Sequence, residues 1–338
     1  MTDYFRPLVQ IGPARPDAAV PLAGGWGWFT HAEVLSRSAS PRVVPATDIP
    51  ASVLARLTAA RTEIASLSLD RPRIMGILNT TPDSFSDGGQ HTAVSDAVRA
   101  GQAMVAAGAD ILDIGGESTR PGADFVLVSE EITRTAPVIA ALRGAGLRTP
   151  ISIDTRKSAV AEAAVSAGAD LVNDVSGFTF DPALGPLCQT LGLPVCVMHA
   201  QGDPATMHLD PRYDNVLLDV YDALERQIAV LEASGIPRSA ILADPGIGFG
   251  KTQEHNLALL ARLSLFHALG TPILLGVSRK RFIGTIGNAP QAQDRAPGSI
   301  AVALAGLGQG VQMIRVHDVK DTRQAVALWH AAYFGSIL

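Results

Sequence analysis

Short apolar runs alternate with alanine-rich segments of helical period from residue 73 to the end of the chain. The runs are continuously apolar rather than alternating, which predicts strands that are buried on both faces. Strands that alternate with helices predict βαβ units and a parallel sheet. The eight runs are Ile74–Leu78, Ile111–Ile114, Ile151–Ile153, Leu171–Val172, Val195–Met198, Ile241–Ala243, Ile273–Val277 and Met313–Val316.

An internal repeat indicates the size of each unit. The sequence Ala-Ala-Gly-Ala-Asp at residues 106–110 returns 60 positions later as Ser-Ala-Gly-Ala-Asp at residues 166–170. Each copy predicts a helix that ends at a glycine and is followed by a strand. Residues 71–338 hold eight units of about 33 residues, which predicts an α/β fold, a (β/α)8 TIM barrel. A doubly wound open sheet is the alternative, because it is built from the same units.

Residues 1–70 lack this pattern and are predicted to form an N-terminal extension of unknown role. Seven of the 22 prolines lie in the first 50 positions, and Trp26 and Trp28 share one short segment. Asp48 is the predicted N-cap of an amphipathic helix that runs to about Leu67. We expect the extension to pack on the barrel, because exposed tryptophans would be costly.

Composition excludes several classes of protein. The net charge of −5 argues against nucleic acid or an anionic membrane as partner, because both select a basic surface. The two cysteines, Cys188 and Cys196, are too few for a disulfide framework or a zinc site. No apolar run is long enough to span a bilayer, and the first residues lack the apolar core of a signal peptide. We therefore expect a globular protein of the cytoplasm.

Polar residues follow every predicted strand. In a parallel barrel the active site lies at the carboxyl ends of the strands, so these residues are expected to converge on one rim. They include Asn79, Glu117, Asp154, Asn173, His199, Asp244, Lys280 and His317. A single aspartate after a strand is more often a helix cap than a catalyst, but polar groups at all eight ends favour a functional site.

Lysine is rare, which draws attention to the places where it occurs. Lys157, Lys251, Lys280 and Lys320 are the four lysines, against 23 arginines, and all lie within about eight positions of a predicted strand end. A bias towards arginine explains part of this distribution. Lys280 is the strongest candidate, because a compact ammonium cannot everywhere be replaced by a planar guanidinium.

The long segment after the first strand contains Asp83 and Asp87. Together with Asn79 they supply the oxygen ligands that Mg²⁺ prefers; an ordinary Asx-turn loop is the alternative. Residues 246–252 resemble a phosphate-binding loop, but Pro245 stands where the motif requires glycine. These glycines are instead expected to let backbone approach a flat ligand, with Phe249 available to stack.

No nucleophile–base pair stands out among the predicted rim residues. The rim instead combines acceptors (Asp154, Asn173, Asp244) with cations (Arg120, Arg315, His317, Lys280). This combination suggests a ligand with a donor-rich heterocycle and an anionic tail, since a carboxylate accepts two parallel N–H bonds from an aminopyrimidine edge.

Several segments resemble the dihydropteroate synthase family. The resemblance covers about residues 73–338 and leaves the extension out. It is carried, in order, by Met75–Asn79, Thr81–Gly89, Asp113–Gly122, Ile153–Thr155, Asn173–Val175, Met198–His199, Asp244–Gly246, Ser278–Lys280 and Arg315–Val319. At two positions, Thr80 and Ala200, the sequence departs from the residues that are common in the family. Neither change removes a charged or ligating group.

The resemblance implies an enzyme that joins 4-aminobenzoate to a dihydropterin methyl diphosphate. The products would be 7,8-dihydropteroate, a folate precursor, and diphosphate. The resemblance also implies Mg²⁺, a homodimer and a target of sulfonamides. No protein nucleophile is required, because diphosphate loss leaves a cation that the pterin ring delocalises and the arylamine then attacks.

The resemblance also implies a role for each candidate residue. The pterin would contact Asp154, Asn173, Met198, Asp244, Phe249 and Lys280, and the diphosphate would contact Asn79, Arg120, Arg315 and His317. The aminobenzoate subsite would comprise Phe85, Thr119, Pro121 and Ser278, and Asn79, Asp83 and Asp87 would be metal candidates. Asp154, Lys280 and Arg120 would be the catalytic residues.

Two other functions share the pterin-binding barrel. A pterin-binding methyltransferase would need no diphosphate site, so Asn79, Arg315 and His317 count against it. A non-catalytic pterin-binding paralogue would be expected to lose residues of the first two loops, and here none is lost.

Overall fold

The strands of residues 71–338 form a closed parallel barrel. The computed structural model describes residues 3–80, 90–118, 125–202, 207 and 209–337. The barrel strands are β6 (Arg73–Asn79), β7 (Ile111–Gly115), β8 (Ile151–Asp154), β9 (Leu171–Asp174), β10 (Val195–Met198), β11 (Ile241–Asp244), β12 (Leu274–Leu275) and β13 (Met313–Val316). Their order is β11-β10-β9-β8-β7-β6-β13-β12. A parallel bridge from Ala243 to Ile273 joins the two ends, which confirms the TIM barrel and excludes the open sheet.

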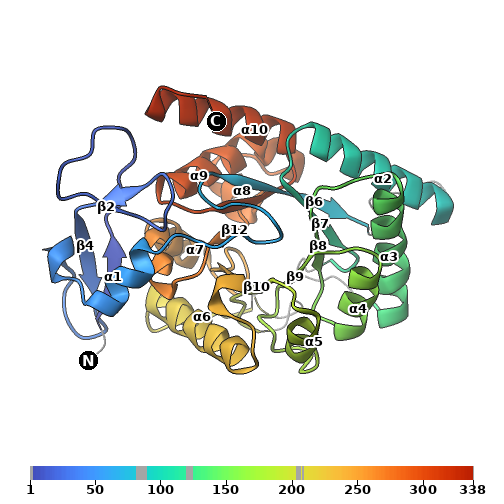
Figure 1. Cartoon of the computed structure of the whole chain (residues 1–338), viewed down its shortest axis with the longest axis horizontal. Helices are drawn as coiled ribbons and strands as arrows, with labels where there is room; N and C mark the ends of the chain where they lie inside the picture. The colour runs from blue at the N-terminus through green and yellow to red at the C-terminus, as the bar shows by residue number, and fades with distance from the viewer. Residues whose placement is uncertain (1–2, 81–89, 119–124, 203–206, 208, 338) are drawn as a thin grey trace.

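Helices surround the strands as an outer layer (Figure 1). The α-helices of this layer are α2 (Gln90–Ala106), α3 (Val128–Gly144), α4 (Ser158–Ser166), α5 (Leu184–Leu191), α6 (Val216–Ala233), α7 (Gln253–Leu260), α8 (Arg281–Ile286), α9 (Ala296–Gly308) and α10 (Val319–Phe334). Short 3-10 turns η3 (Arg238–Ala240), η4 (Leu263–Leu269) and η5 (Ala292–Arg295) join some of them. No described helix is both long and apolar enough to cross a membrane.

In each copy of the internal repeat, an arginine bonds the glycine carbonyl and the aspartate of the repeat, near the amino end of a strand. Arg323 donates to the carbonyl of Gly108 and to Asp110, and Asp110 accepts from the backbone N–H of Ile74 at 2.8 Å. In the second copy, Arg143 donates to the Gly168 carbonyl and to Asp170, whose carboxylate accepts from Ile151 N–H at 2.8 Å. The repeat therefore stabilises the end of the barrel opposite the predicted site.

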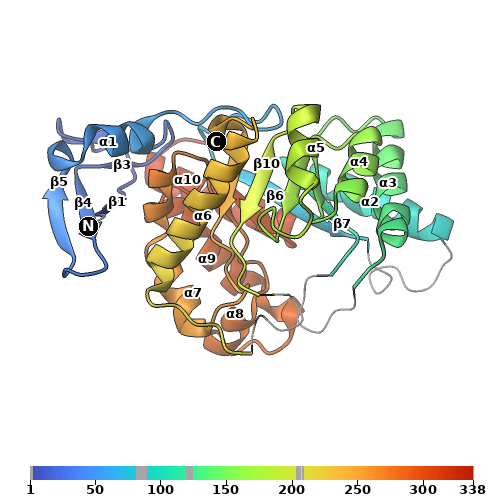
Figure 2. The same ribbon diagram turned by 90° about the horizontal axis from the view of Figure 1, so that it is seen from below.

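The extension contains a small antiparallel sheet beside the barrel. Its sheet pairs β1 (Tyr4–Pro7), β4 (His31–Leu35) and β5 (Arg42–Pro45), and β2 (Val20–Pro21) pairs with β3 (Trp28–Phe29). The extension lies on the side away from α2, α3 and α4 (Figures 1 and 2). The Trp26 indole donates to the Leu307 carbonyl at 2.9 Å and its ring meets Trp329 edge to face, so this tryptophan is buried against α9 and α10.

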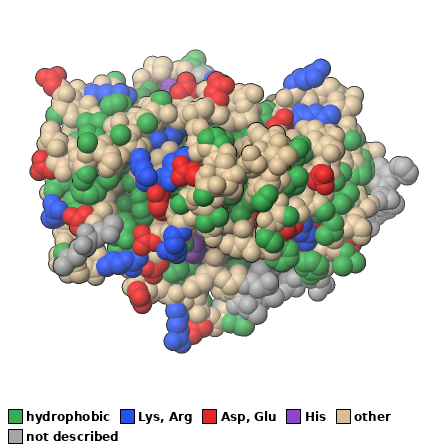
Figure 3. All heavy atoms as spheres, turned by 60° about the horizontal axis from the view of Figure 1, so that its bottom comes forward, with side chains coloured by type: hydrophobic (Ala, Val, Ile, Leu, Met, Phe, Trp, Pro, Cys, Tyr) green, Lys and Arg blue, Asp and Glu red, His purple; other side chains and the backbone are tan. Residues whose placement is uncertain are grey.

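The last residues of the extension cover the end of the barrel at which the strands begin. Ile64 and Leu69 are buried in one apolar cluster with strand residues that include Met75, Ile111 and Met313. Ion pairs also join the extension to α6, among them Arg37 with Asp219 and Asp222. On the face shown in Figure 3, basic and acidic side chains lie next to one another.

The helix expected from Asp48 to Leu67 is shorter than predicted. A 3-10 turn, η1 (Ala46–Asp48), precedes α1 (Ala51–Thr58), whose N-cap is Pro50 and not Asp48. Arg61 donates to the Arg56 and Ala59 carbonyls and so caps the end of α1. Ile64 and Leu67 then pair across a tight turn, which a continuous helix would not allow.

Candidate active site

Strand register brings the predicted pterin residues together at one rim. Asp154 lies opposite Asn173 on the neighbouring strand, and Met198 lies opposite Asp244. Asn173, Met198 and Asp244 are buried. Because parallel strands end at the same edge, these side chains line one end of the barrel as the sequence predicts.

An arginine joins two carboxylates at the centre of this rim. The Nε of Arg315 lies 2.5 Å from Asp113 Oδ2, and its Nη2 lies 2.7 Å from Asp154 Oδ2. Asn173 donates its side-chain amide to the same Asp113 oxygen at 3.2 Å. Arg315, predicted to contact phosphates, is therefore held among the residues that were predicted to contact the pterin.

Asp113 is a site residue that the sequence reasoning did not single out. It is fully buried, and its Oδ1 has no hydrogen-bond partner among the described residues. The available signal was a carboxylate inside the apolar run Ile111–Ile114, because a strand buried on both faces has no solvent for a charged side chain.

Burial shifts the ionisation of this cluster. It raises the pKa of Asp154 to about 7, although the Arg315 charge opposes the shift. Burial also raises the pKa of Asp244. Burial disfavours the charge of Arg315, yet Asp113 and Asp154 together raise the pKa of its guanidinium further above its ordinary value. The rim thus contains carboxyl groups whose charge is sensitive to what binds beside them.

A glycine turn after β11 forms one wall of the site. Asp244 Oδ1 accepts from Gly246 N–H at 2.7 Å. A Cβ on Gly246, whose φ is +67°, would lie 1.9 Å from the His199 carbonyl oxygen, so only glycine fits this close approach. The Phe249 ring that follows lies 4.1 Å below the Lys280 ammonium. The turn thus brings the Phe249 ring and the Lys280 ammonium together at the rim.

The ends of the last two strands meet through a hydrogen bond. Ser278 Oγ lies 2.9 Å from His317 Nδ1, and His317 N–H donates to the same hydroxyl at 3.1 Å. Ser278 was predicted to contact aminobenzoate and His317 a phosphate, and the structure makes them direct neighbours. Asn79 ends β6 opposite Gly115 and is half-buried.

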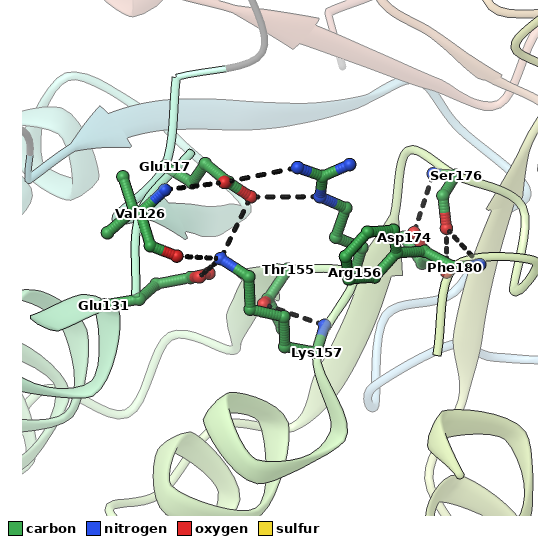
Figure 4. A network of polar contacts seen from close by, with 9 residues as sticks. All are labelled: Glu117, Val126, Glu131, Thr155, Arg156, Lys157, Asp174, Ser176 and Phe180. Carbon is green, nitrogen blue, oxygen red and sulfur yellow. Dashed lines mark hydrogen bonds and ion pairs between the residues drawn. The ribbon is translucent and has the colours of Figure 1, made fainter. Parts of the chain in front are cut away.

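A buried ionic network connects the residues after β7 with those after β8 (Figure 4). Glu117 accepts from Val126 N–H at 3.2 Å and from Arg156 Nε at 3.1 Å. Lys157 Nζ lies 3.2 Å from Glu117 and 2.6 Å from Glu131 and donates to the Val126 carbonyl. Lys157 therefore serves this network, which explains its place near a strand end without a catalytic role.

A cavity of about 340 Å³ opens beside these loops. Its lining includes Arg156, Phe180, Met207 and Phe249, and the guanidinium of Arg156 lies 4.1 Å from the centre of the Phe180 ring. Asp174 holds the neighbouring turn, because its carboxylate accepts from Ser176 and from Phe178 N–H. Asp174 is thus a loop-stabilising residue.

Six predicted site residues lie outside the described part of the chain. They are Asp83, Phe85, Asp87, Thr119, Arg120 and Pro121.

Comparison with known proteins finds relatives that match the barrel. The family model of pterin binding enzymes matches residues 75–317. The dihydropteroate synthase of Escherichia coli K12 is 47% identical over 266 residues, which cover 79% of this chain and 93% of that protein. The Xanthomonas albilineans dihydropteroate synthase, solved with 4-aminobenzoic acid, has a TM-score of 0.75 and 45% identity, covering 80% of this chain and 97% of that one.

Two further solved structures extend the comparison. The same X. albilineans enzyme in complex with 7,8-dihydropteroate has a TM-score of 0.72 and 43% identity, covering 79% and 95% of the two chains. The Yersinia pestis dihydropteroate synthase with a sulfonamide drug complex has a TM-score of 0.75 and 43% identity, covering 80% and 98%.

The barrel, its rim and the match over residues 75–317 place the chain in the pterin-binding enzyme family. Within that family it is similar throughout the barrel to dihydropteroate synthases. The chain is a transferase of that kind, which confirms the family, the fold and the enzyme class predicted from the sequence.

Proposed function

We propose that the barrel condenses (7,8-dihydropterin-6-yl)methyl diphosphate with 4-aminobenzoate to give 7,8-dihydropteroate and diphosphate in folate biosynthesis. The observation that carries this proposal is the cluster in which Arg315 pairs with Asp113 and Asp154 while Asn173 donates to Asp113. This cluster supplies acceptors for the N–H groups of a pterin ring beside a half-buried cation. The names of the similar enzymes support the same reaction.

In this proposal the pterin ring lies between the acceptors of the strand ends and the turn after β11. Asp154, Asn173 and Asp244 would face the polar edge of the ring. Asp154, whose pKa is near 7, could accept from the ring or donate to it. Met198 and Phe249 would contact its faces. Lys280, whose ammonium lies on the Phe249 ring, would contact the ring edge.

The anionic tail would lie towards the ends of β6 and β13. His317 is held there by Ser278, and Arg120 and Arg315 would supply further positive charge. Ser278 would also border the aminobenzoate subsite together with Phe85, Thr119 and Pro121. Positive charge at this end lowers the energy of the leaving diphosphate more than that of the bound substrate, which is the condition for catalysis.

The donor set at this end fits Mg²⁺. Mg²⁺ is usually held by one or two protein oxygens together with substrate phosphates, and the half-buried Asn79 offers an amide oxygen at the rim. Asp83 and Asp87 are the further candidates. Among the described residues, no three His, Cys, Asp or Glu side chains are grouped closely enough to hold a metal. When bound, Mg²⁺ would neutralise charge on the departing diphosphate.

The reaction breaks the bond from the pterin methylene carbon to the diphosphate oxygen and forms a bond from that carbon to the arylamine nitrogen. The nitrogen then loses a proton. The residues of this chain would orient the ring, neutralise the leaving group and keep water from the methylene carbon. None of them needs to form a covalent intermediate.

The test is an assay of diphosphate release from the pterin diphosphate with Mg²⁺. We expect release that requires 4-aminobenzoate in stoichiometric amount. A pterin methyltransferase would release no diphosphate, and a binding paralogue would bind the pterin without turnover. Release that is independent of 4-aminobenzoate would contradict the proposal.

We also propose a homodimer located in the cytoplasm, as the resemblance implies, and a structural role for residues 1–70. The contacts of Trp26, Ile64 and Leu69 with the barrel support the last point. Light scattering of the purified chain tests the dimer, and a monomer at micromolar concentration would contradict it.

A further inference from the structure

Lys251 occupies an unusual environment behind the wall of the proposed pterin site. It is 4% exposed, and its Nζ lies 2.9 Å from the Gly246 carbonyl and 3.0 Å from the Phe249 carbonyl. The same nitrogen lies 2.9 Å from His199 Nδ1 and 3.2 Å from the His199 carbonyl. One buried ammonium thus joins the turn after β11 to the residue that follows β10.

Among the described residues this ammonium forms no ion pair, since its four contacts go to uncharged acceptors. Burial lowers the pKa of Lys251 to about 7, and burial and the Lys251 charge lower the pKa of His199 to about 3. His199 is therefore neutral and accepts at Nδ1. The nearby Asp244 charge offsets the burial of Lys251 only in part. A buried cation that contacts no carboxylate is costly, so its presence calls for a reason beyond packing.

The turn that Lys251 joins is intrinsically flexible. Gly246 and Gly248 adopt φ of +67° and +85°, and glycine loses more conformational freedom on folding than any other residue. Asp244 holds the N–H of Gly246 and Lys251 holds its carbonyl. The peptide groups on both sides of this glycine are thereby fixed.

The contacts of Lys251 connect it with three proposed pterin residues: Phe249 through a direct bond, and Met198 and Lys280 through neighbouring residues. Its bond to the Phe249 carbonyl fixes the residue whose ring lies 4.1 Å from the Lys280 ammonium. Its bonds to His199 fix the residue next to Met198. Gly248 also touches the stem of Lys280, since a Cβ there would lie 3.1 Å from Lys280 Cδ.

We propose that Lys251 is a positioning residue for the reaction: its ammonium fixes the turn so that Phe249 and Lys280 lie at the face and edge of the bound pterin. This inference rests on the proposed function, because it takes the pterin as the ligand. Lys251 does not touch the pterin itself. It acts through Phe249, and this route separates a positioning role from a merely structural one.

The experiment measures binding of 7,8-dihydropteroate by calorimetry to the full chain and to Lys251→Met, which keeps the length of the side chain and removes its donors. We expect at least roughly tenfold weaker binding. Lys320→Met is the matched control, because Lys320 is exposed on α10, and it should bind within about twofold of the unchanged chain. Equal affinity of Lys251→Met and the unchanged chain would overturn the proposal.

A double-mutant cycle with Phe249→Leu tests the route of the effect. If Lys251 acts through Phe249, the double variant should bind about as weakly as the weaker single variant, because the two losses are coupled. Losses that multiply would show that Lys251 acts independently of Phe249 and would also overturn the proposal. Thermal unfolding of each variant reports stability separately.

A second substitution keeps the test decisive if Lys251→Met does not fold. Lys251→Arg retains the charge but distributes its N–H donors over a planar guanidinium group. The four acceptors surround a single nitrogen atom and cannot all bond to that group. The same tenfold loss and the same coupling to Phe249→Leu are expected. If the unchanged chain itself fails to bind 7,8-dihydropteroate, the proposed function fails. The inference alone fails if the unchanged chain binds and either the Lys251 variants bind equally well or their losses multiply with the loss from Phe249→Leu.

Discussion

The guanidinium of Arg315 connects Asp113 on β7 with Asp154 on β8, at 2.5 Å and 2.7 Å from the two carboxylates. One cluster of charged side chains at the rim therefore joins strands β7, β8 and β13. Asn173 on β9 joins it through Asp113. Because Asp113 and Asn173 are buried and Arg315 and Asp154 are half-buried, changing any member would alter the charge balance at the rim.

Substitution of Asp154 by asparagine tests the role of this carboxyl in pterin binding. A charge-assisted hydrogen bond contributes about 1.5–3 kcal/mol, so Asp154→Asn should weaken 7,8-dihydropteroate binding by roughly ten- to a hundredfold. The exposed Asp210, which pairs only with Arg212 among the described residues, supplies the control Asp210→Asn. Unchanged affinity of Asp154→Asn for 7,8-dihydropteroate, measured by calorimetry, would contradict the assignment of Asp154 to the pterin site.

The same variant tests the raised pKa of Asp154. The ordinary carboxyl pKa is about 3.9, and burial raises the folded value to about 7. Between these values the unfolded chain loses the proton while the folded chain keeps it, so the stability due to this group falls as pH rises from about 4 to 7. Urea unfolding should therefore show Asp154→Asn gaining stability relative to the unchanged chain across this window. A constant difference would refute the shift.

Substitution of Lys280 by arginine separates the effect of side-chain shape from the effect of charge, because it changes the first and keeps the second. The Lys280 ammonium lies on the Phe249 ring, where a planar guanidinium would intrude on the space proposed for the pterin. Lys280→Arg should lower kcat/KM at least roughly tenfold, or about 1.4 kcal/mol. Lys320→Arg, on the exposed part of α10, should be nearly silent. If both substitutions are silent, the rarity of lysine reflects arginine bias alone.

The ionic network around Lys157 should matter for stability. Glu131 is fully buried, and among the described residues it forms an ion pair with Lys157. Lys157→Met leaves that carboxylate uncompensated and should cost about 3–5 kcal/mol in the free energy of unfolding. Adding Glu131→Gln should restore part of the loss, because it removes the buried charge. Urea titration checks both values, and no recovery in the double variant would contradict this account.

Several features could be predicted from the sequence because they depend on local patterns. Continuously apolar runs placed all eight strands, although only Leu274–Leu275 of the run Ile273–Val277 forms β12. Parallel topology then brought Asp154, Asn173 and Asp244 to one rim without further information. The repeated Gly-Ala-Asp segments marked true helix ends.

Other features could not be predicted because they depend on partners distant in sequence. Asp113 looked like part of an apolar strand, and its pairing with Arg315 spans 202 positions. The four contacts of Lys251 arise only when the ends of β10 and β11 lie side by side. The extension followed no pattern beyond its prolines, and a tight turn at Ile64–Leu67 replaced the expected end of its helix.

The most direct test of the central claim is detection of the product. The purified chain is incubated with (7,8-dihydropterin-6-yl)methyl diphosphate, 4-aminobenzoate and Mg²⁺, and 7,8-dihydropteroate is followed by mass spectrometry. We expect product from the unchanged chain, with a strongly reduced rate in Asp154→Asn and a normal rate in Asp210→Asn. Absence of 7,8-dihydropteroate from an unchanged chain that binds the pterin diphosphate would contradict the assignment of this barrel as a synthase.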